Sequence, residues 1–121
     1  MRSLVCVVDD DESVRESLPD LLREFGFAAR AFSSALAFLE SDGLGECHCL
    51  LLDVAMPEMT GPELQQELKR RGRTMPIVYI TAHADDELRP RLLAEGAAEC
   101  LFKPFGQTDL LDALNRALGK A

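Results

Sequence analysis

The segment Leu4-Val5-Cys6-Val7-Val8-Asp9-Asp10-Asp11-Glu12 joins a continuous apolar run to a cluster of four acids. The apolar run lacks the polar and apolar alternation of a strand that has one face in water, so it predicts a strand covered on both faces, as in parallel sheets. After the acids, apolar residues at helical spacing predict a helix from about Ser13 to Phe25. Pro19 lies inside it and predicts an interruption or bend, because proline removes a helical hydrogen bond.

Outward from this unit, four more short apolar runs alternate with amphipathic stretches. The predicted strands are Phe27–Ala31, Cys49–Leu52, Pro76–Ile80 and Glu99–Phe102. The predicted helices are one capped by Ser33 or Ser34 that carries Leu36, Phe38 and Leu39, then Thr60–Arg71, about Asp85–Glu95, and Thr108–Leu118. Five such strand and helix units, joined by right-handed crossovers, predict an α/β fold with a doubly wound parallel sheet between helices.

Composition limits the function classes. The 121 residues, 47% of them hydrophobic, contain no linker, repeat or low-complexity segment, so we expect one domain over residues 1–121. No apolar run approaches the about 20 residues that cross a bilayer, and the N-terminus lacks a secretory signal, so we expect a cytoplasmic protein with no membrane partner. With 13 Lys and Arg against 21 Asp and Glu, the net charge of −8 disfavours direct binding of nucleic acid.

The four cysteines are expected to be reduced thiols in that compartment. Cys47-His48-Cys49 raises zinc binding as an alternative. Alternate residues of an extended chain point to opposite sides, however, and tetrahedral zinc sites use wider spacings with a second ligand pair. A plain strand edge is the favoured interpretation of this triplet.

Polar residues follow four of the five predicted strands, at the edge where open α/β sheets bind ligands. They are Asp9 to Glu12 after the first strand, Asp53 after the third, Thr81, Ala82 and His83 after the fourth, and Lys103 and Pro104 after the fifth. Singly, each has a simpler interpretation: a helix start for the acids, a turn at Asp53, a cap at Thr81 and a solvated charge at Lys103. Their joint placement favours one site.

Three carboxylates at one edge raise each other's pKa unless a cation lies between them. Mg²⁺ fits this role, because it prefers oxygen ligands and is typically held by one or two carboxylates together with a phosphate. Lys103 and Thr81 would then serve as donors to phosphoryl oxygens. The sequence thus predicts a magnesium-dependent phosphoryl site.

Four segments carry a family resemblance: Val7-Val8-Asp9-Asp10, Leu51 to Gly61 with the pattern D-x-x-M-P-x-M-x-G, Ile80-Thr81-Ala82, and Phe102-Lys103-Pro104-Phe105. Together and in this order they are highly specific. Over its full length the chain resembles the receiver domain of bacterial two-component response regulators (CheY-like), and most of all the nitrogen-fixation type. The resemblance implies a flavodoxin-like (βα)5 fold with strand order 2-1-3-4-5.

The resemblance also implies roles. Asp53 would accept a phosphoryl group from the phosphohistidine of a sensor histidine kinase or phosphotransfer protein. Asp10 and Asp53 would bind Mg²⁺ directly, the Ala55 carbonyl would complete the protein ligands, and Asp9 would act through water. Lys103 would pair with the phosphoryl group.

Further implications concern phosphoryl binding, backbone geometry and the output. Thr81 and the Ala82 amide would hydrogen-bond the phosphoryl group, and the bond before Pro104 would be cis, which X-Pro energetics permit. The domain would switch an output surface, with a homodimer through the fourth helix and fifth strand, and an effector domain would act in transcription. The domain would catalyse only its own phosphorylation and dephosphorylation and would otherwise not be an enzyme.

Two residues depart from the family pattern. Cys100 stands where many receivers have an aromatic switch residue, which predicts a weak response of the output face. Ala55 is too small to reach an attacking water, so dephosphorylation would depend on His83 or on a phosphatase.

Two other function classes remain as alternatives. A flavodoxin-like nucleotide or redox domain has the same order of elements, but it needs a phosphate-cradling loop after the first strand, where the acids would repel it. A small-molecule Mg²⁺-dependent phosphatase with Asp53 as nucleophile would need a larger enclosure for its substrate than this short chain offers.

Overall fold

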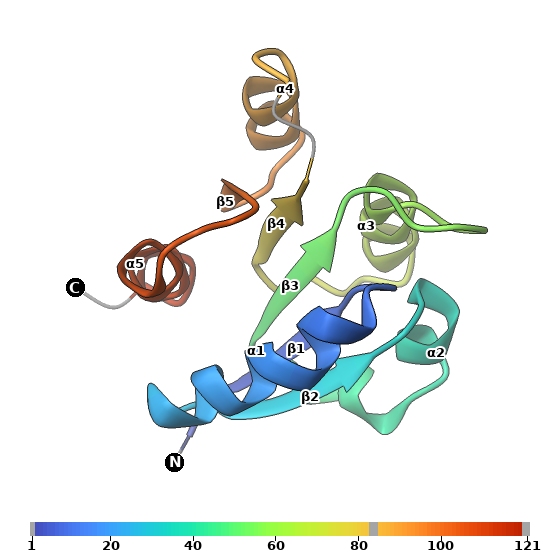
Figure 1. Ribbon diagram of the computed structural model, residues 1–121. Coiled ribbons are helices and arrows are strands. Elements are labelled where there is room, and N and C mark those ends of the chain that lie inside the picture. Colours follow the sequence, from blue (N-terminus) through green and yellow to red (C-terminus); the bar gives the residue numbers. More distant parts are fainter. Residues whose placement is uncertain (1, 83–84, 120–121) are drawn as a thin grey trace.

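Five parallel strands form one sheet in the order β2-β1-β3-β4-β5 in the computed structural model, which describes residues 2–82 and 85–119 (Figure 1). The strands are β1 (Leu4–Val8), β2 (Ala28–Phe32), β3 (Cys49–Asp53), β4 (Ile77–Thr81) and β5 (Glu99–Phe102). The helices are α1 (Glu12–Glu24), α2 (Ala35–Leu39), the 3-10 turn η1 (Asp42–Gly45), α3 (Gly61–Arg70), α4 (Leu88–Ala94) and α5 (Gln107–Ala117). The predicted doubly wound fold and its strand order are confirmed.

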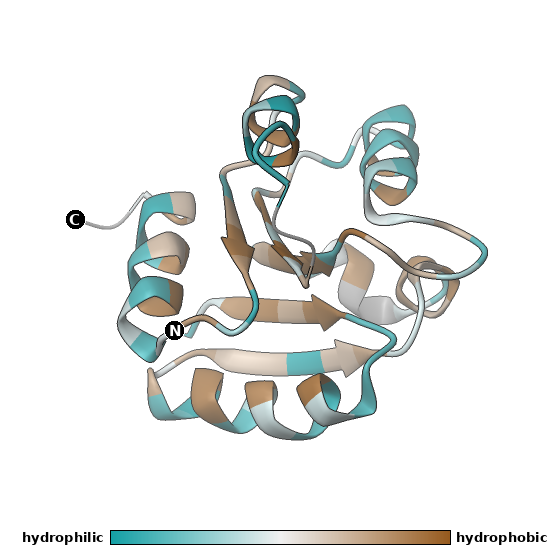
Figure 2. Cartoon of the chain, turned by 45° about the horizontal axis from the view of Figure 1, so that its top comes forward, coloured by the Kyte–Doolittle hydropathy of each residue, from teal (hydrophilic) through white to brown (hydrophobic). Residues whose placement is uncertain are grey.

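Each face of the sheet is covered by its own helices. α1 and α5 pack on one face, where Leu22 and Leu114 join strand residues such as Val7 in one apolar cluster. α2, α3 and α4 cover the other face, where Leu64 and Leu92 lie in a second cluster. Figure 2 shows the apolar side of each helix turned toward the strands. The central strands are buried on both faces, as their unbroken apolar runs predicted.

Two helices differ from the sequence prediction. α1 is not interrupted at Pro19; it continues to Glu24, and Pro19 is buried within it. α4 begins at Leu88 rather than near Asp85, because the Asp85 carboxylate accepts a hydrogen bond from the Glu87 amide at 3.0 Å. Such a local turn competes with helical hydrogen bonding and delays the start of the helix.

Asp53 and Thr81 are the last residues of β3 and β4, whereas the sequence predicted that these strands end one residue earlier. Asp53 is paired in register with Ile80. The Lys103 amide donates to the Thr81 carbonyl at 2.8 Å, which continues the pairing of β4 and β5 beyond their ends. The sheet itself therefore fixes the backbone of these residues.

The Cys47-His48-Cys49 triplet lies at the start of a strand, as its favoured interpretation predicted, since Cys49 is the first residue of β3. All four cysteines lie in described residues and are free thiols. The imidazole Nδ1 of His48 accepts a hydrogen bond from the Leu4 amide at 2.8 Å, beside the start of β3. Within residues 2–82 and 85–119, Cys47-His48-Cys49 contributes to no cluster of three metal-ligating side chains, so the structure gives the zinc alternative no support.

No helix in the described part of the chain is both long enough and apolar enough to span a bilayer.

Candidate functional site

Three carboxylates converge where β1 and β3 end side by side. Asp9, Asp10 and Asp53 each offer an oxygen, and these oxygens lie within 4.8 Å of one another. Asp9 and Asp10 follow β1 directly, and Asp53 closes the neighbouring strand β3. This is the cluster that the strand-end pattern predicted, and its oxygen donors suit a hard divalent cation.

Asp9 is the most confined of the three. Its side chain is fully buried, and Oδ2 accepts a hydrogen bond from Lys103 Nζ at 3.0 Å. Oδ1 accepts from the Asp11 amide at 2.9 Å, and the Asp9 carbonyl accepts from the Arg15 guanidinium at 3.1 Å. Lys103 therefore enters the acidic cluster from β5, with its ammonium on Asp9.

Asp53 is only 6% exposed. Burial, together with the negative charge of Asp9 and a hydrogen bond with Asp10, raises the pKa of Asp53 to about 7, although Lys103 and the Ala55 amide oppose this shift. The Ala55 amide donates to Asp53 Oδ1 at 3.4 Å. The raised pKa shows that the single positive charge of Lys103 does not offset burial and the repulsion among three carboxylates. A divalent cation between them would supply the missing charge.

The other predicted site residues lie at the same edge of the sheet. Thr81 is buried at the end of β4, next to β3, and Ala82 beside it is exposed. The Lys103-Pro104 bond is cis, as the resemblance implied. His83 lies outside the described residues.

Only part of the acid run belongs to the cluster. The Asp11 carboxylate accepts a hydrogen bond from the Ser13 amide at 2.9 Å and caps α1, and Glu12 lies in the first turn. Both acids favour the positive end of the helix dipole. The helix-start interpretation is therefore correct for these two acids, while Asp9 and Asp10 face Asp53.

Gly61 is a positioning residue whose role periodicity and strand ends do not reveal. A Cβ on Gly61 would lie 2.5 Å from the Asp53 carbonyl oxygen and 2.9 Å from Cε1 of Tyr79. The Gly61 amide also donates to the Val54 carbonyl at 2.9 Å. The first residue of α3 thus packs against the backbone that carries Asp53. Its place in the motif after Asp53 was the only available signal.

We expect Gly61→Ala to destabilise the fold by about 1–3 kcal/mol, because the added methyl group meets rigid backbone. Denaturation in urea would measure this loss. Gly45→Ala is the matched control, since a Cβ there has no atom within 4 Å, and its effect should stay below about 0.5 kcal/mol. Equal stability of the two variants would contradict the close packing at Gly61.

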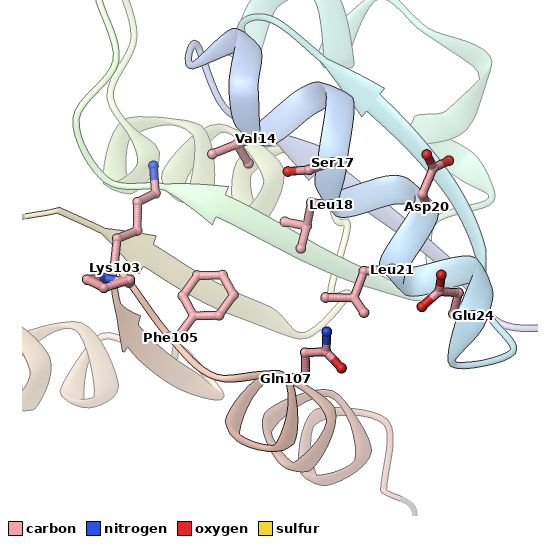
Figure 3. A pocket seen from close by; sticks show the side chains of 10 residues that line it. Val14, Ser17, Leu18, Asp20, Leu21, Glu24, Lys103, Phe105 and Gln107 are labelled. Carbon is pink, nitrogen blue, oxygen red and sulfur yellow. The ribbon is translucent and has the colours of Figure 1, made fainter.

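A groove of about 530 Å³ runs from Lys103 along α1 (Figure 3). In Figure 3, Phe105 lies across the groove from Leu18 and Leu21 of α1, and Asp20 and Glu24 stand at the end away from Lys103. The groove is therefore mostly apolar next to the acidic cluster and acidic at its far end. Phe105 belongs to the Phe102-Lys103-Pro104-Phe105 motif, and its place in this groove follows only from the structure.

Comparison with known proteins identifies this arrangement. A family model described as the response regulator receiver domain matches residues 5–115. The chain belongs to the response regulator receiver domain family. Its role is in two-component signalling, in which a receiver is in general partnered by a histidine kinase. The flavodoxin-like and phosphatase alternatives gain no support from these relatives.

Curated relatives of the receiver agree with this assignment. The chain is 42% identical over 116 residues to the response regulator protein TmoT of Ectopseudomonas mendocina. This alignment covers 96% of the chain and 53% of TmoT. The chain is also 39% identical over 117 residues to the transcriptional regulatory protein FixJ of Azorhizobium caulinodans, and this alignment covers 97% of the chain and 56% of FixJ. The chain thus spans about half the length of these relatives, and the predicted likeness to nitrogen-fixation receivers is confirmed.

Solved structures give the same fold. The response regulator StyR matches with a TM-score of 0.87 and 47% identity, over 98% of this chain and 60% of that one. The N-terminal part of FixJ matches with a TM-score of 0.86 and 33% identity, over 100% of this chain and 97% of that structure.

The two departures from the family pattern have clear positions in this receiver. Ala55 is exposed beside Asp53. Cys100 is 3% exposed in the core and is paired in register with Tyr79 of β4. The weak output response expected from Cys100 stays a prediction.

Proposed function

We propose that Asp53 is the phosphoryl acceptor of this receiver and that Mg²⁺ is its cofactor. Asp10 and Asp53 would hold the ion directly, together with the Ala55 carbonyl, and Asp9 would act through a bound water. The observation that carries this proposal is the set of three carboxylate oxygens within 4.8 Å of one another, with Lys103 bound to one of them. When bound, the cation supplies charge neutralisation between the carboxylates and the phosphoryl oxygens.

In the proposed reaction, a carboxylate oxygen of Asp53 attacks the phosphorus of a phosphohistidine. The new oxygen–phosphorus bond forms as the nitrogen–phosphorus bond breaks, and the electron pair stays on the imidazole of the donor. The product is an acyl phosphate on Asp53. Because the sheet fixes the Asp53 backbone, the nucleophile meets the donor with little loss of conformational freedom.

Three residues would bind the transferred group. The Lys103 ammonium, which lies 3.0 Å from Asp9, has further donors for a phosphoryl oxygen. The Thr81 hydroxyl and the Ala82 amide would bind another oxygen from the end of β4. Donors aimed at the transferring group stabilise the charge that it carries.

We infer that the groove beside Lys103 receives the sensor histidine kinase or phosphotransfer protein. Its apolar lining from Leu18, Leu21 and Phe105 would bury an apolar helix face of that partner. The groove begins at Lys103, so a partner seated there would bring its phosphohistidine next to Asp53. This encounter would take place in the cytoplasm.

The proposed output is a change of surface rather than turnover of a substrate. Residues 1–121 would form one receiver domain that catalyses only its own phosphorylation and dephosphorylation. Phosphorylation would favour a homodimer through α4 and β5. The relatives that are transcriptional regulators support an effector outside this domain that contacts DNA, because the net charge of −8 disfavours such contact here.

Phosphorylation of the purified domain by acetyl phosphate tests this function. With Mg²⁺, the intact mass should gain one phosphoryl group, and neutral hydroxylamine should remove it, since hydroxylamine cleaves acyl phosphates and leaves phosphoserine intact. Chelation of Mg²⁺ should prevent the gain. A stable label, or several labels, would refute the assignment.

A further inference from the structure

Tyr79 lies at the centre of the layer behind the proposed site. Its side chain is fully buried in β4, paired in register with Leu52 of β3 and Cys100 of β5. The ring packs against the first residue of α3, since Cε1 lies 2.9 Å from where a Cβ of Gly61 would be. Gly61 in turn packs against the Asp53 carbonyl. The ring therefore supports the backbone that carries Asp53.

The Tyr79 hydroxyl begins a chain of hydrogen bonds that ends at α4. It donates to Gln65 Oε1 in α3 at 2.6 Å. Gln65 is 4% exposed, and its Nε2 donates to the Glu95 carbonyl at 3.2 Å. Lys69 Nζ donates to the same carbonyl at 2.9 Å. Since Glu95 is the C-cap residue of α4, this chain ties the C-terminal end of α4 to α3 and β4.

The two ends of α4 are held differently. The carbonyl at its C-terminal end accepts two side-chain donors from α3. At its N-terminal end, within the described residues, the Glu87 side chain makes no capping hydrogen bond, and Arg89 of the first turn donates to Glu99 Oε1 of β5 at 2.6 and 3.1 Å. The Arg89 side chain is about half exposed, and exposed ion pairs contribute little stability, whereas Gln65 is buried. The N-terminal end of α4 is therefore held less firmly than the C-terminal end.

The small side chain of Cys100 is consistent with this arrangement. Cys100 and Tyr79 lie side by side on the same face of the sheet and belong to the same apolar cluster. The buried aromatic ring beside Cys100 therefore comes from Tyr79 of β4, whereas Phe102 of β5 is only partly buried against the same cluster. The Tyr79 hydroxyl is a donor at neutral pH, since the usual pKa of tyrosine is about 10 and burial raises it further.

We propose that Tyr79 is a positioning residue that links the Asp53 segment to the C-terminal end of α4, so that α4 pivots about this end when the domain is phosphorylated. The link through Gln65 consists of hydrogen bonds that the structure contains, so it does not depend on the proposed function. Only the pivot rests on the proposed function. The output change would then appear at residues 86–91, while residues 92–97 stay in place.

Amide hydrogen exchange of the complete chain tests the link first without any phosphoryl mimic. Tyr79→Phe removes the hydroxyl and leaves Gln65 Oε1 buried without its donor. We expect exchange at residues 92–97 to become at least tenfold faster than in the wild type. Val78→Ala is the control, because Val78 is buried on the opposite face of the same strand, and it should not produce this local change.

A double variant separates the link from simple destabilisation. Tyr79→Phe with Gln65→Leu removes both polar partners, so much of the lost stability should return. Exchange at residues 92–97 should nevertheless stay fast, since the link from Tyr79 through Gln65 to Glu95 is broken and only Lys69 still donates to the Glu95 carbonyl. Wild-type exchange in Tyr79→Phe, or equal acceleration in Val78→Ala, would overturn the link.

Beryllofluoride with Mg²⁺ then tests the pivot. In the wild type, exchange should change at residues 86–91 and stay constant at 92–97, whereas in Tyr79→Phe the change should extend to 92–97. Equal changes at both ends in the wild type would overturn the pivot. A wild type that neither accepts phosphate nor responds to the mimic would refute the proposed function and, with it, the pivot, while the exchange without mimic still decides the link.

Discussion

Asp53→Asn is expected to abolish phosphorylation by acetyl phosphate, because the amide lacks the carboxylate oxygen that attacks phosphorus. Intact mass spectrometry after incubation with Mg²⁺ measures the loss directly. The control is Asp112→Asn, which changes an exposed carboxylate of α5 and should be labelled like the wild type. A phosphoryl group on Asp53→Asn at the wild-type level would show that another residue is the acceptor.

The same substitution should also stabilise the metal-free fold above neutral pH. In the native state the pKa of Asp53 is raised to about 7, above its value in the unfolded chain. Between about pH 4 and pH 7 the native state therefore binds more protons than the unfolded state, so wild-type stability falls as the pH rises through this window.

Asn carries no charge and lacks this penalty, so Asp53→Asn should exceed the wild type at pH 8 by on the order of 2 kcal/mol in chelator-treated buffer. Urea denaturation at pH 5 and pH 8 measures the effect, and the difference between the two proteins should shrink at pH 5. A difference that does not depend on pH would mean that burial does not hold Asp53 in its protonated form.

Mg²⁺ is expected to raise the Tm of the wild type. A ligand of the folded state at ten times its Kd stabilises by about 1.4 kcal/mol, which raises the Tm of a domain this size by about 5–6 °C. Asp10→Asn should remove most of this rise, because it deletes one of the three carboxylates. In metal-free buffer the substitution should be neutral or stabilising, since it relieves repulsion with Asp9 and Asp53.

Asp11→Asn is the matched control for this measurement. Asp11 neighbours Asp10 in the chain, but its side chain caps α1 rather than joining the cluster. Asparagine is as good an N-cap as aspartate, so this variant should fold normally and keep the full response to Mg²⁺. An undiminished response of Asp10→Asn would exclude direct coordination by Asp10.

The sequence by itself determined the class of fold and the edge that carries the site. Apolar runs without alternation require cover on both faces, and helical spacing between them supplies it, so the parallel sheet follows from burial alone. In such a sheet the residues after neighbouring strands must meet. Asp9, Asp10, Asp53 and Lys103 could therefore be placed at one edge without coordinates. That Lys103 reaches Asp9 across the two strands between β5 and β1 was decided by the tertiary structure.

The tertiary structure alone decided which atoms meet behind that edge. Periodicity states which face of an element is buried, but not which residue of another element it contacts. Tyr79 belonged to a predicted buried strand, but nothing in the sequence placed Gln65 in the interior. Their 2.6 Å hydrogen bond depends on how α3 lies on β4. The close packing of Gly61 on Asp53 depends on the same placement. A buried hydroxyl needs a hydrogen-bond partner, and closely packed backbone leaves no room for a methyl group. Which residues meet these two requirements is determined only when the helices and strands have assembled.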